Sequence, residues 1–178
     1  MMKWMIAVSM LLLTAAPALA GQNLSVEAFF GRYSGGGIAS NEDSLFFAVT
    51  ARDFDVTIAA AGRGFRIDWT SVIRGGGTPD KPRIRRKSAT KIFMPTGRPS
   101  VFHGTQSGDP LAGKEMCWAR VTGRTLSVFL MTVDQDGIYE LQQYDRTLSG
   151  SGMDLVFRSS RDGDRLRTVK GKLVKVAK

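Results

Sequence analysis

The chain has one histidine, His103, and one cysteine, Cys117, which are its candidates for a catalytic base and a nucleophile. Nucleophilic catalysis needs a Ser or Cys activated by a histidine, but no Gly-x-Ser-x-Gly turn is present to position a serine. Cys117 lies between Met116 and Trp118, a setting typical of a small buried side chain. With one cysteine and one histidine, the chain cannot form a disulfide framework, a Cys/His zinc site or an iron–sulfur cluster. These residue types favour a protein without a catalytic centre.

The acidic residues do not form a recognisable catalytic or metal-binding site either. Asp53 and Asp55 are two positions apart, which places them on the solvent face of a strand, opposite Phe54. The segments 134–137 and 162–164 resemble the beginnings of calcium loops, but the further ligands that such loops need do not follow. Asp and Gly at these places are typical of tight hairpin turns. We therefore expect no metal site and no cofactor.

The first twenty residues have the pattern of an export signal. Lys3 supplies a positive start, residues 5–13 are uncharged, and Ala18-Leu19-Ala20 places small residues where signal peptidase requires them. The alternative, a membrane anchor, needs about 20 apolar residues, more than this segment has. The sequence thus predicts cleavage after Ala20, a single domain over residues 21–178, and a periplasmic or secreted location.

Apolar and polar residues alternate with period two along much of residues 21–178. The pattern predicts strands at 54–60 and 65–74, and the glycine-containing turn between them indicates a β-hairpin. Further strands are expected at 28–38, 45–51, 84–94, 116–121, 126–133, 138–148, 153–158 and 166–176. A short helix is expected at 26–30 or within 95–114. So many antiparallel strands predict an all-β fold, an up-and-down β-barrel of about eight to ten strands, with a β-sandwich as the alternative.

The segment Gly31-Arg32-Tyr33 resembles the Gly-x-Trp motif that opens the chains of lipocalins and their calycin relatives, with Tyr33 in the place of Trp. The resemblance implies an up-and-down barrel with an internal cavity for a small apolar molecule. It also implies that an arginine late in the chain packs over the ring of Tyr33, and Arg158 and Arg167 are the candidates. It implies no particular binding residue, because lipocalin cavities share shape rather than sequence.

Positive charge is concentrated in two segments of a chain whose net charge is +9: residues 81–108 carry +7 and residues 158–178 carry +6. Such surfaces attract anions over a Debye length of about 8–10 Å. No aromatic residues lie among the basic residues 83–87, so nucleic acid is not expected. Phospholipid head groups or an acidic envelope polymer are the expected anions, with peripheral membrane contact. The alternative is a solvated strand that its lysines and arginines protect from edge pairing. The proposed anionic-surface patch consists of Arg83, Arg85, Arg86, Lys87 and Lys91.

The segment 126–133 is apolar on both faces, so it lies under a second layer or beside a cavity. The leading hypothesis is a soluble exported barrel that binds a small apolar or lipid-like ligand without chemical turnover. Two alternatives remain: an envelope protein that acts through the basic patch, and a small outer-membrane β-barrel. The residues expected to line the cavity are Tyr33, Phe47, Trp69, Trp118, Phe129 and Met131.

Overall fold

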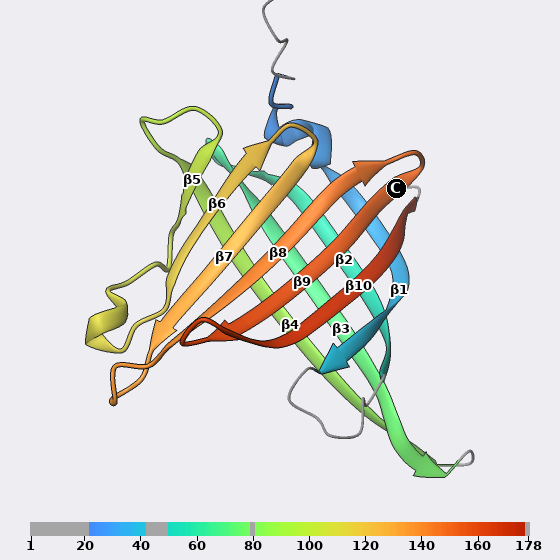
Figure 1. Ribbon diagram of the computed structural model, residues 1–178. Coiled ribbons are helices and arrows are strands. Elements are labelled where there is room, and N and C mark those ends of the chain that lie inside the picture. The colour runs from blue at the N-terminus through green and yellow to red at the C-terminus, as the bar shows by residue number, and fades with distance from the viewer. Residues whose placement is uncertain (1–21, 42–49, 79–80, 177–178) are drawn as a thin grey trace, which may run out of the picture.

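In a computed structural model, the chain forms a closed barrel of ten antiparallel strands in up-and-down order (Figure 1). The structure describes residues 22–41, 50–78 and 81–176. The expected export signal, Phe47 and most of the strand expected at 45–51 lie outside these residues. The prediction of an all-β up-and-down barrel is confirmed, and the chain does not adopt the alternative sandwich.

The strands follow one another around the barrel, and β10 pairs with β1 to close it. Their bounds are β1 Gly31–Asn41, β2 Thr50–Ala61, β3 Gly64–Thr78, β4 Lys81–Pro95, β5 Val101–Gly104, β6 Met116–Thr122, β7 Thr125–Val133, β8 Tyr139–Ser149, β9 Gly152–Arg161 and β10 Asp164–Val176. Two short 3-10 helices, η1 (Val26–Phe29) and η2 (Pro110–Ala112), are the helices of the described residues. Neither of them is long and apolar enough to cross a membrane.

The register of the strands separates an inner face from an outer face. Val56 lies opposite Tyr33 on one side and Trp69 on the other, and because residues paired across strands share a face, all three point inward. Their chain neighbours, such as Asp55 and Asp68, point outward. The inner-face residues include nearly the whole apolar core, which confirms the alternation predicted for the β2–β3 hairpin.

The end of the barrel next to η1 is sealed by apolar side chains. Phe29, Phe65 and Phe93 are 0% exposed. The Phe65 ring stacks on Phe93 with centroids 5.0 Å apart and meets the edge of Phe102 at the same distance. Figure 1 shows η1 lying across this end of the barrel. We call this the closed end.

Tyr33 fastens η1 to the barrel. Its hydroxyl donates a hydrogen bond of 3.0 Å to the carbonyl oxygen of Phe29, and the Lys175 ammonium lies 5.7 Å from the centre of its ring. The expectation of Arg158 or Arg167 over this ring is therefore wrong. Arg158 pairs with Asp145 at 2.7 Å, and Arg167 lies opposite Asn41, at the other end of β1. A lysine occupies the position over the ring because Lys175, not an arginine, is paired with Tyr33 in the register.

Replacing this tyrosine should loosen the closed end. Tyr33→Phe keeps the buried ring and removes one hydrogen bond, so we expect the free energy of unfolding to fall by about 1 kcal/mol. Urea denaturation followed by circular dichroism measures the change. Tyr139→Phe is the control, since Tyr139 is exposed and should leave the midpoint unchanged. Equal midpoints for wild type and Tyr33→Phe would show that this hydrogen bond does not hold η1.

Candidate functional site

Away from the closed end, the inner face becomes more polar and partly open to solvent. The inward-facing residues that are only half-buried there include Arg52, Trp69, Ser71, Gln142, Tyr144 and Phe157. Because these side chains point into the barrel, their exposure indicates that solvent reaches the inner face from the end opposite η1. We call this the open end.

Three aromatic rings form a layer across the interior between the two ends. Trp69 and Tyr144 have ring centroids 5.4 Å apart, and Tyr144 and Phe157 lie 4.7 Å apart. Trp69 is on β3 and Tyr144 is on β8, strands that are not neighbours in the sheet, so their contact spans the barrel. We call Trp69, Tyr144 and Phe157 the aromatic layer.

Arg146 is a buried cation beside this layer. It is 1% exposed, and its guanidinium carbon lies 5.6 Å from the ring centre of Trp69 and 5.5 Å from that of Tyr144. Its neighbours in the register are Leu126 and Leu155, which offer no acceptor side chain. Burial lowers the pKa of Arg146 to about 10, so the guanidinium remains charged at neutral pH. A buried charge without full hydrogen bonding is costly to the folded state.

The unpaired polar atoms of the interior belong to three residues. Among the described residues, the buried side-chain nitrogen and oxygen atoms without a hydrogen-bond partner are Nε and Nη1 of Arg146, Nε of Arg52 and Oγ of Ser71. All three residues point inward. Burial lowers the pKa of Arg52, and the positive charges of Arg167 and Arg85 lower it further. We call Arg52, Ser71 and Arg146 the interior arginine site.

The carboxylates close to the interior already have hydrogen-bond or ion-pair partners. Glu140 accepts hydrogen bonds from Gln142 at 2.9 Å and from Ser159 at 3.0 Å. Glu115 is paired with Lys91. Asp145 follows Tyr144 in the strand, so it points outward, where it pairs with Arg158. None of these three carboxylates hydrogen-bonds to Arg52 or Arg146.

The structure brings only part of the expected cavity lining together. Tyr33 and Trp69 point inward, Tyr33 at the closed end and Trp69 in the aromatic layer. Trp118, Phe129 and Met131 lie on the outer face, where Trp118 stacks on Phe129 at 4.8 Å. These three residues therefore do not line the interior. Sequence reasoning missed Tyr144, Arg146 and Phe157; Tyr144 and Arg146 lie on β8, whose two faces are both polar, so no local signal marked them as inward-facing.

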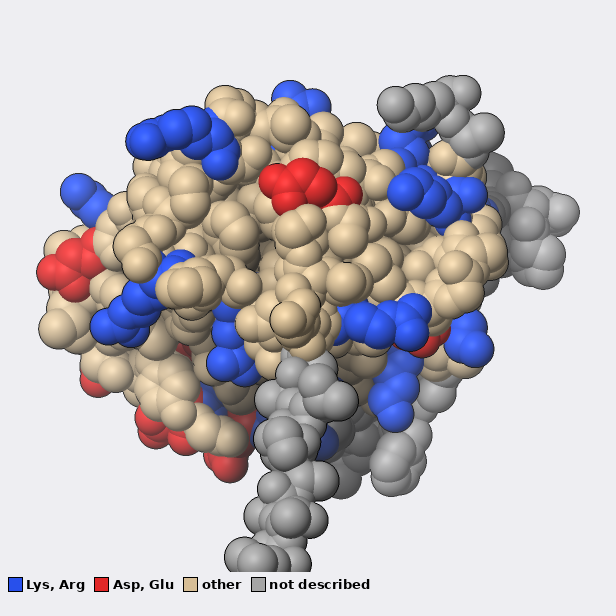
Figure 2. Space-filling view, turned by 90° about the horizontal axis from the view of Figure 1, so that it is seen from above, with Lys and Arg blue, Asp and Glu red and all other residues tan. Residues whose placement is uncertain are grey.

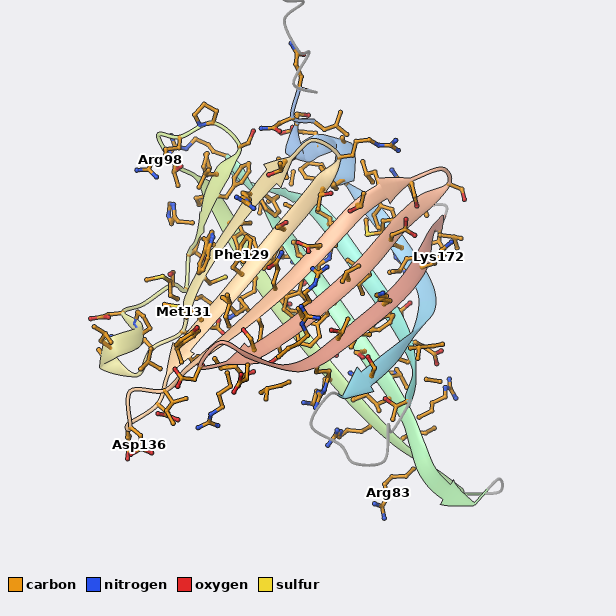
Figure 3. All side chains as sticks on the ribbon, in the orientation of Figure 1. Arg83, Arg98, Phe129, Met131, Asp136 and Lys172 are labelled. Atoms are coloured by element: carbon orange, nitrogen blue, oxygen red, sulfur yellow. The ribbon has the colours of Figure 1, made fainter. Side chains whose placement is uncertain are left out.

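The expected basic patch does not form one surface. Arg83, Arg85, Arg86 and Lys87 are exposed on β4, where the β3–β4 hairpin extends past the rest of the barrel (Figures 1 and 3). Alternation places Arg86 on the opposite face from Arg85 and Lys87. Lys91 lies nearer the closed end, opposite Ile67 of β3, and pairs with Glu115. At the closed end, Figure 2 shows basic side chains spread around the rim with neutral and acidic surface between them.

His103 and Cys117 do not form a catalytic pair. His103 is exposed on β5 and lies opposite Trp118 of the outer face, whereas Cys117 is 1% exposed and points inward from β6. Burial raises the pKa of the Cys117 thiol to about 11. No three His, Cys, Asp or Glu side chains of the described segments are grouped so that they could hold a metal ion.

The buried thiol should resist alkylation. Since its raised pKa keeps Cys117 protonated at pH 8 and its sulfur is shielded, we expect iodoacetamide to react at least about 100-fold more slowly with the folded protein than with the protein in denaturant. Mass spectrometry of timed samples gives both rates. Comparable rates would place the thiol at the surface and contradict its inward position.

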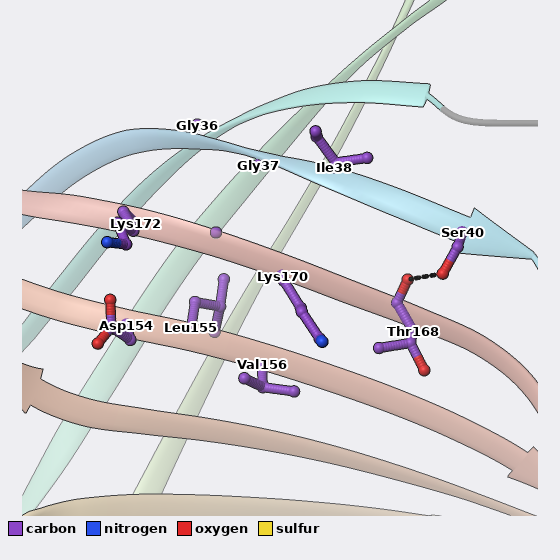
Figure 4. A pocket seen from close by; sticks show the side chains of 11 residues that line it. Gly36, Gly37, Ile38, Ser40, Asp154, Leu155, Val156, Thr168, Lys170 and Lys172 are labelled. Atoms are coloured by element: carbon purple, nitrogen blue, oxygen red, sulfur yellow. Dashed lines mark hydrogen bonds between the residues drawn. The ribbon is translucent and has the colours of Figure 1, made fainter.

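A groove of about 790 Å³ lies on the outer wall of β1, β9 and β10 (Figure 4). Gly36, Gly37 and Gly171 form its floor without side chains, and Lys170 and Lys172 extend beside it. Ile38, 59% exposed, stands at its rim. None of the unpaired buried polar atoms belongs to a residue that lines it. Ile38, Lys170 and Lys172 point outward in the register, so the groove is a feature of the outer surface.

Comparison with known proteins does not assign the chain to a family. No family model matches the chain, and no curated protein sequence matches it. Among solved structures, an S-type phycobiliprotein lyase from Guillardia theta is similar over 87% of this chain and 94% of that chain, with 8% sequence identity and a TM-score of 0.40.

Proposed function

We propose that the protein is an exported, non-catalytic barrel that binds a small amphipathic molecule on its inner face. The observation that carries the proposal is the partial exposure of the inward-facing rings of Trp69, Tyr144 and Phe157, in a barrel whose other end is closed by the fully buried Phe29, Phe65 and Phe93. Covering exposed apolar surface stabilises a complex by about 25 cal/mol per Å². A ligand that enters from the open end and covers the aromatic layer gains this free energy.

The sequence resemblance supports the same proposal. Gly31-Arg32-Tyr33 lies at the start of β1, and the barrel is closed, as the calycin resemblance implies. Lys175 replaces the expected arginine over the aromatic ring. A calycin-like barrel with a small ligand inside is therefore our interpretation of the fold.

The outer face supports a water-soluble barrel over one embedded in lipid. It carries ion pairs between Arg74 and Asp53 and between Arg66 and Asp68. Arginine or lysine on a lipid-facing wall costs about 2–4 kcal/mol near the bilayer midplane. Such ion pairs are therefore expected on a wall that faces water.

Export is supported by the pattern of residues 1–20. Fractionation of cells that express the full chain tests it: we propose recovery outside the cytoplasm, with Gly21 as the first residue.

Titration with cis-parinaric acid, a fluorescent fatty acid, tests binding. We expect saturable binding at one site per chain, and native mass spectrometry should show the same stoichiometry. Trp69→Ala should weaken binding, because it removes a ring of the aromatic layer, whereas the outer-face Trp118→Ala should not. Absence of binding in both measurements would contradict the proposed function.

A second candidate function is contact with an anionic envelope surface. The observation that favours it is the extended β3–β4 hairpin with its exposed Arg83, Arg85 and Arg86. Sedimentation with vesicles containing phosphatidylglycerol tests it. Binding that is lost when the three arginines are changed to Glu, while cis-parinaric acid still binds, would establish the β3–β4 hairpin as a separate site.

A further inference from the structure

We infer that the molecule bound inside the barrel carries an anionic group, a carboxylate or a phosphate, and that Arg146 holds it. This inference depends on the proposed function, since it names the chemical class of the same ligand. It is carried by a different observation, the unpaired donors of the interior arginine site.

The first step concerns hydrogen bonding. Buried polar groups in native proteins almost always have partners, and each exception calls for an explanation. Every unpaired buried side-chain atom of the described residues belongs to Arg52, Ser71 or Arg146, all of them on the inner face. Two of the three nitrogens of the Arg146 guanidinium are among them. Guanidinium N–H groups only donate, so the missing partner is an acceptor.

The second step concerns charge. Arg146 is fully buried and charged, and Arg52 feels the positive charges of Arg85 and Arg167. The inner-face carboxylates of Glu115 and Glu140 are engaged by other groups. A neutral acceptor would satisfy hydrogen bonds and leave this excess of positive charge. An anion satisfies both, and arginine is the residue best suited to carboxylate and phosphate oxygens.

The third step gives the orientation of the ligand. Tyr144, Arg146 and Leu148 occupy successive inward-facing positions of β8. Leu148 is nearest the closed end, and Tyr144 belongs to the aromatic layer, so Arg146 lies between that layer and the closed end. Arg52 lies near the start of β2, toward the open end. In the register Arg52 lies opposite Ile73, nearer the open end than the pair of Val56 and Trp69. The anionic group therefore binds deepest, at Arg146, and the apolar part of the ligand extends along the aromatic layer toward the open end, past Arg52.

The test compares cis-parinaric acid with its methyl ester, which has the same chain and no charge. We expect the wild type to bind the acid at least about 10-fold more tightly than the ester, as charge-assisted hydrogen bonds imply. Arg146→Met should reduce affinity for the acid by about the same factor and leave affinity for the ester unchanged. Arg120→Met removes a charge from the exposed outer face and should alter neither. Displacement of the acid by dodecanoate or by dodecyl phosphate then identifies which anion is preferred.

The outcomes separate the two proposals. Equal affinity of the wild type for acid and ester, or an Arg146→Met variant that keeps the preference for the acid, overturns the anion site and leaves the proposed function standing. Binding of neither probe overturns the proposed function itself. Circular dichroism establishes that the variants fold. If Arg146→Met does not fold, Arg146→Gln, which removes the charge and keeps a polar side chain, carries the test, and an unchanged preference for the acid in that variant also overturns the inference.

Discussion

Arg146→Met should make the ligand-free barrel more stable than the wild type. The substitution replaces a buried, incompletely hydrogen-bonded guanidinium with an apolar side chain of similar length among Leu126, Leu155 and the aromatic layer. Replacing buried ionic groups with apolar residues of similar volume stabilises proteins by about 1–4 kcal/mol in favourable cases, and we expect a gain in this range. A gain in stability of this kind is what we expect if Arg146 serves the proposed anion rather than the fold.

Urea denaturation at pH 7, without ligand, measures this gain as a higher free energy of unfolding. The matched control is Arg120→Met, which removes the same charge from the surface and should change stability by less than about 0.5 kcal/mol. A clear loss of stability in Arg146→Met would mean that the guanidinium supports the fold, and would remove the reason for assigning it a ligand.

Gly64→Ala should destabilise the barrel severely. A Cβ atom at Gly64 would lie 1.8 Å from the carbonyl oxygen of Phe93 on the neighbouring β4, far inside van der Waals contact. Because Phe93 is 0% exposed and stacked on Phe65, the backbone of β4 cannot move away without opening the closed end. We expect a loss of at least about 3 kcal/mol, at the upper end of what overpacking costs.

The control for this substitution is Gly97→Ala, in the loop after β4, where an added Cβ meets nothing within 4 Å. Its effect should be below about 0.5 kcal/mol. The comparison by urea denaturation removes the general effect of replacing glycine with alanine. If the two variants unfold at similar urea concentrations, the close packing of β3 against β4 at the closed end is not as described.

The barrel was predictable because its strands carry local signals. Phe65, Ile67 and Trp69 alternate with charged residues, so their face and their turn are evident from the sequence. The strand β5 was not evident, because its four residues lie in an irregular stretch and become a strand through pairing with β4 and β6.

The site was less predictable than the fold, for a physical reason. On β6 and β7 both faces are apolar, so Trp118 and Phe129 could not be assigned to a face; they cover each other on the outside. On β8 both faces are polar, and nothing local distinguishes inward-facing Arg146 from outward-facing Asp145. Only pairing with β7 and β9 determines which side chain enters the core.

Contact quenching by a brominated fatty acid is the most direct test of ligand binding inside the barrel. Bromine quenches tryptophan only at short range, and Trp69 lies in the aromatic layer whereas Trp118 lies outside. We expect 9,10-dibromostearate to reduce the emission of wild type and of Trp118→Phe in a saturable manner, and to leave the emission of Trp69→Phe unchanged. Quenching that persists in Trp69→Phe and disappears in Trp118→Phe would place the ligand on the outer wall and contradict this account.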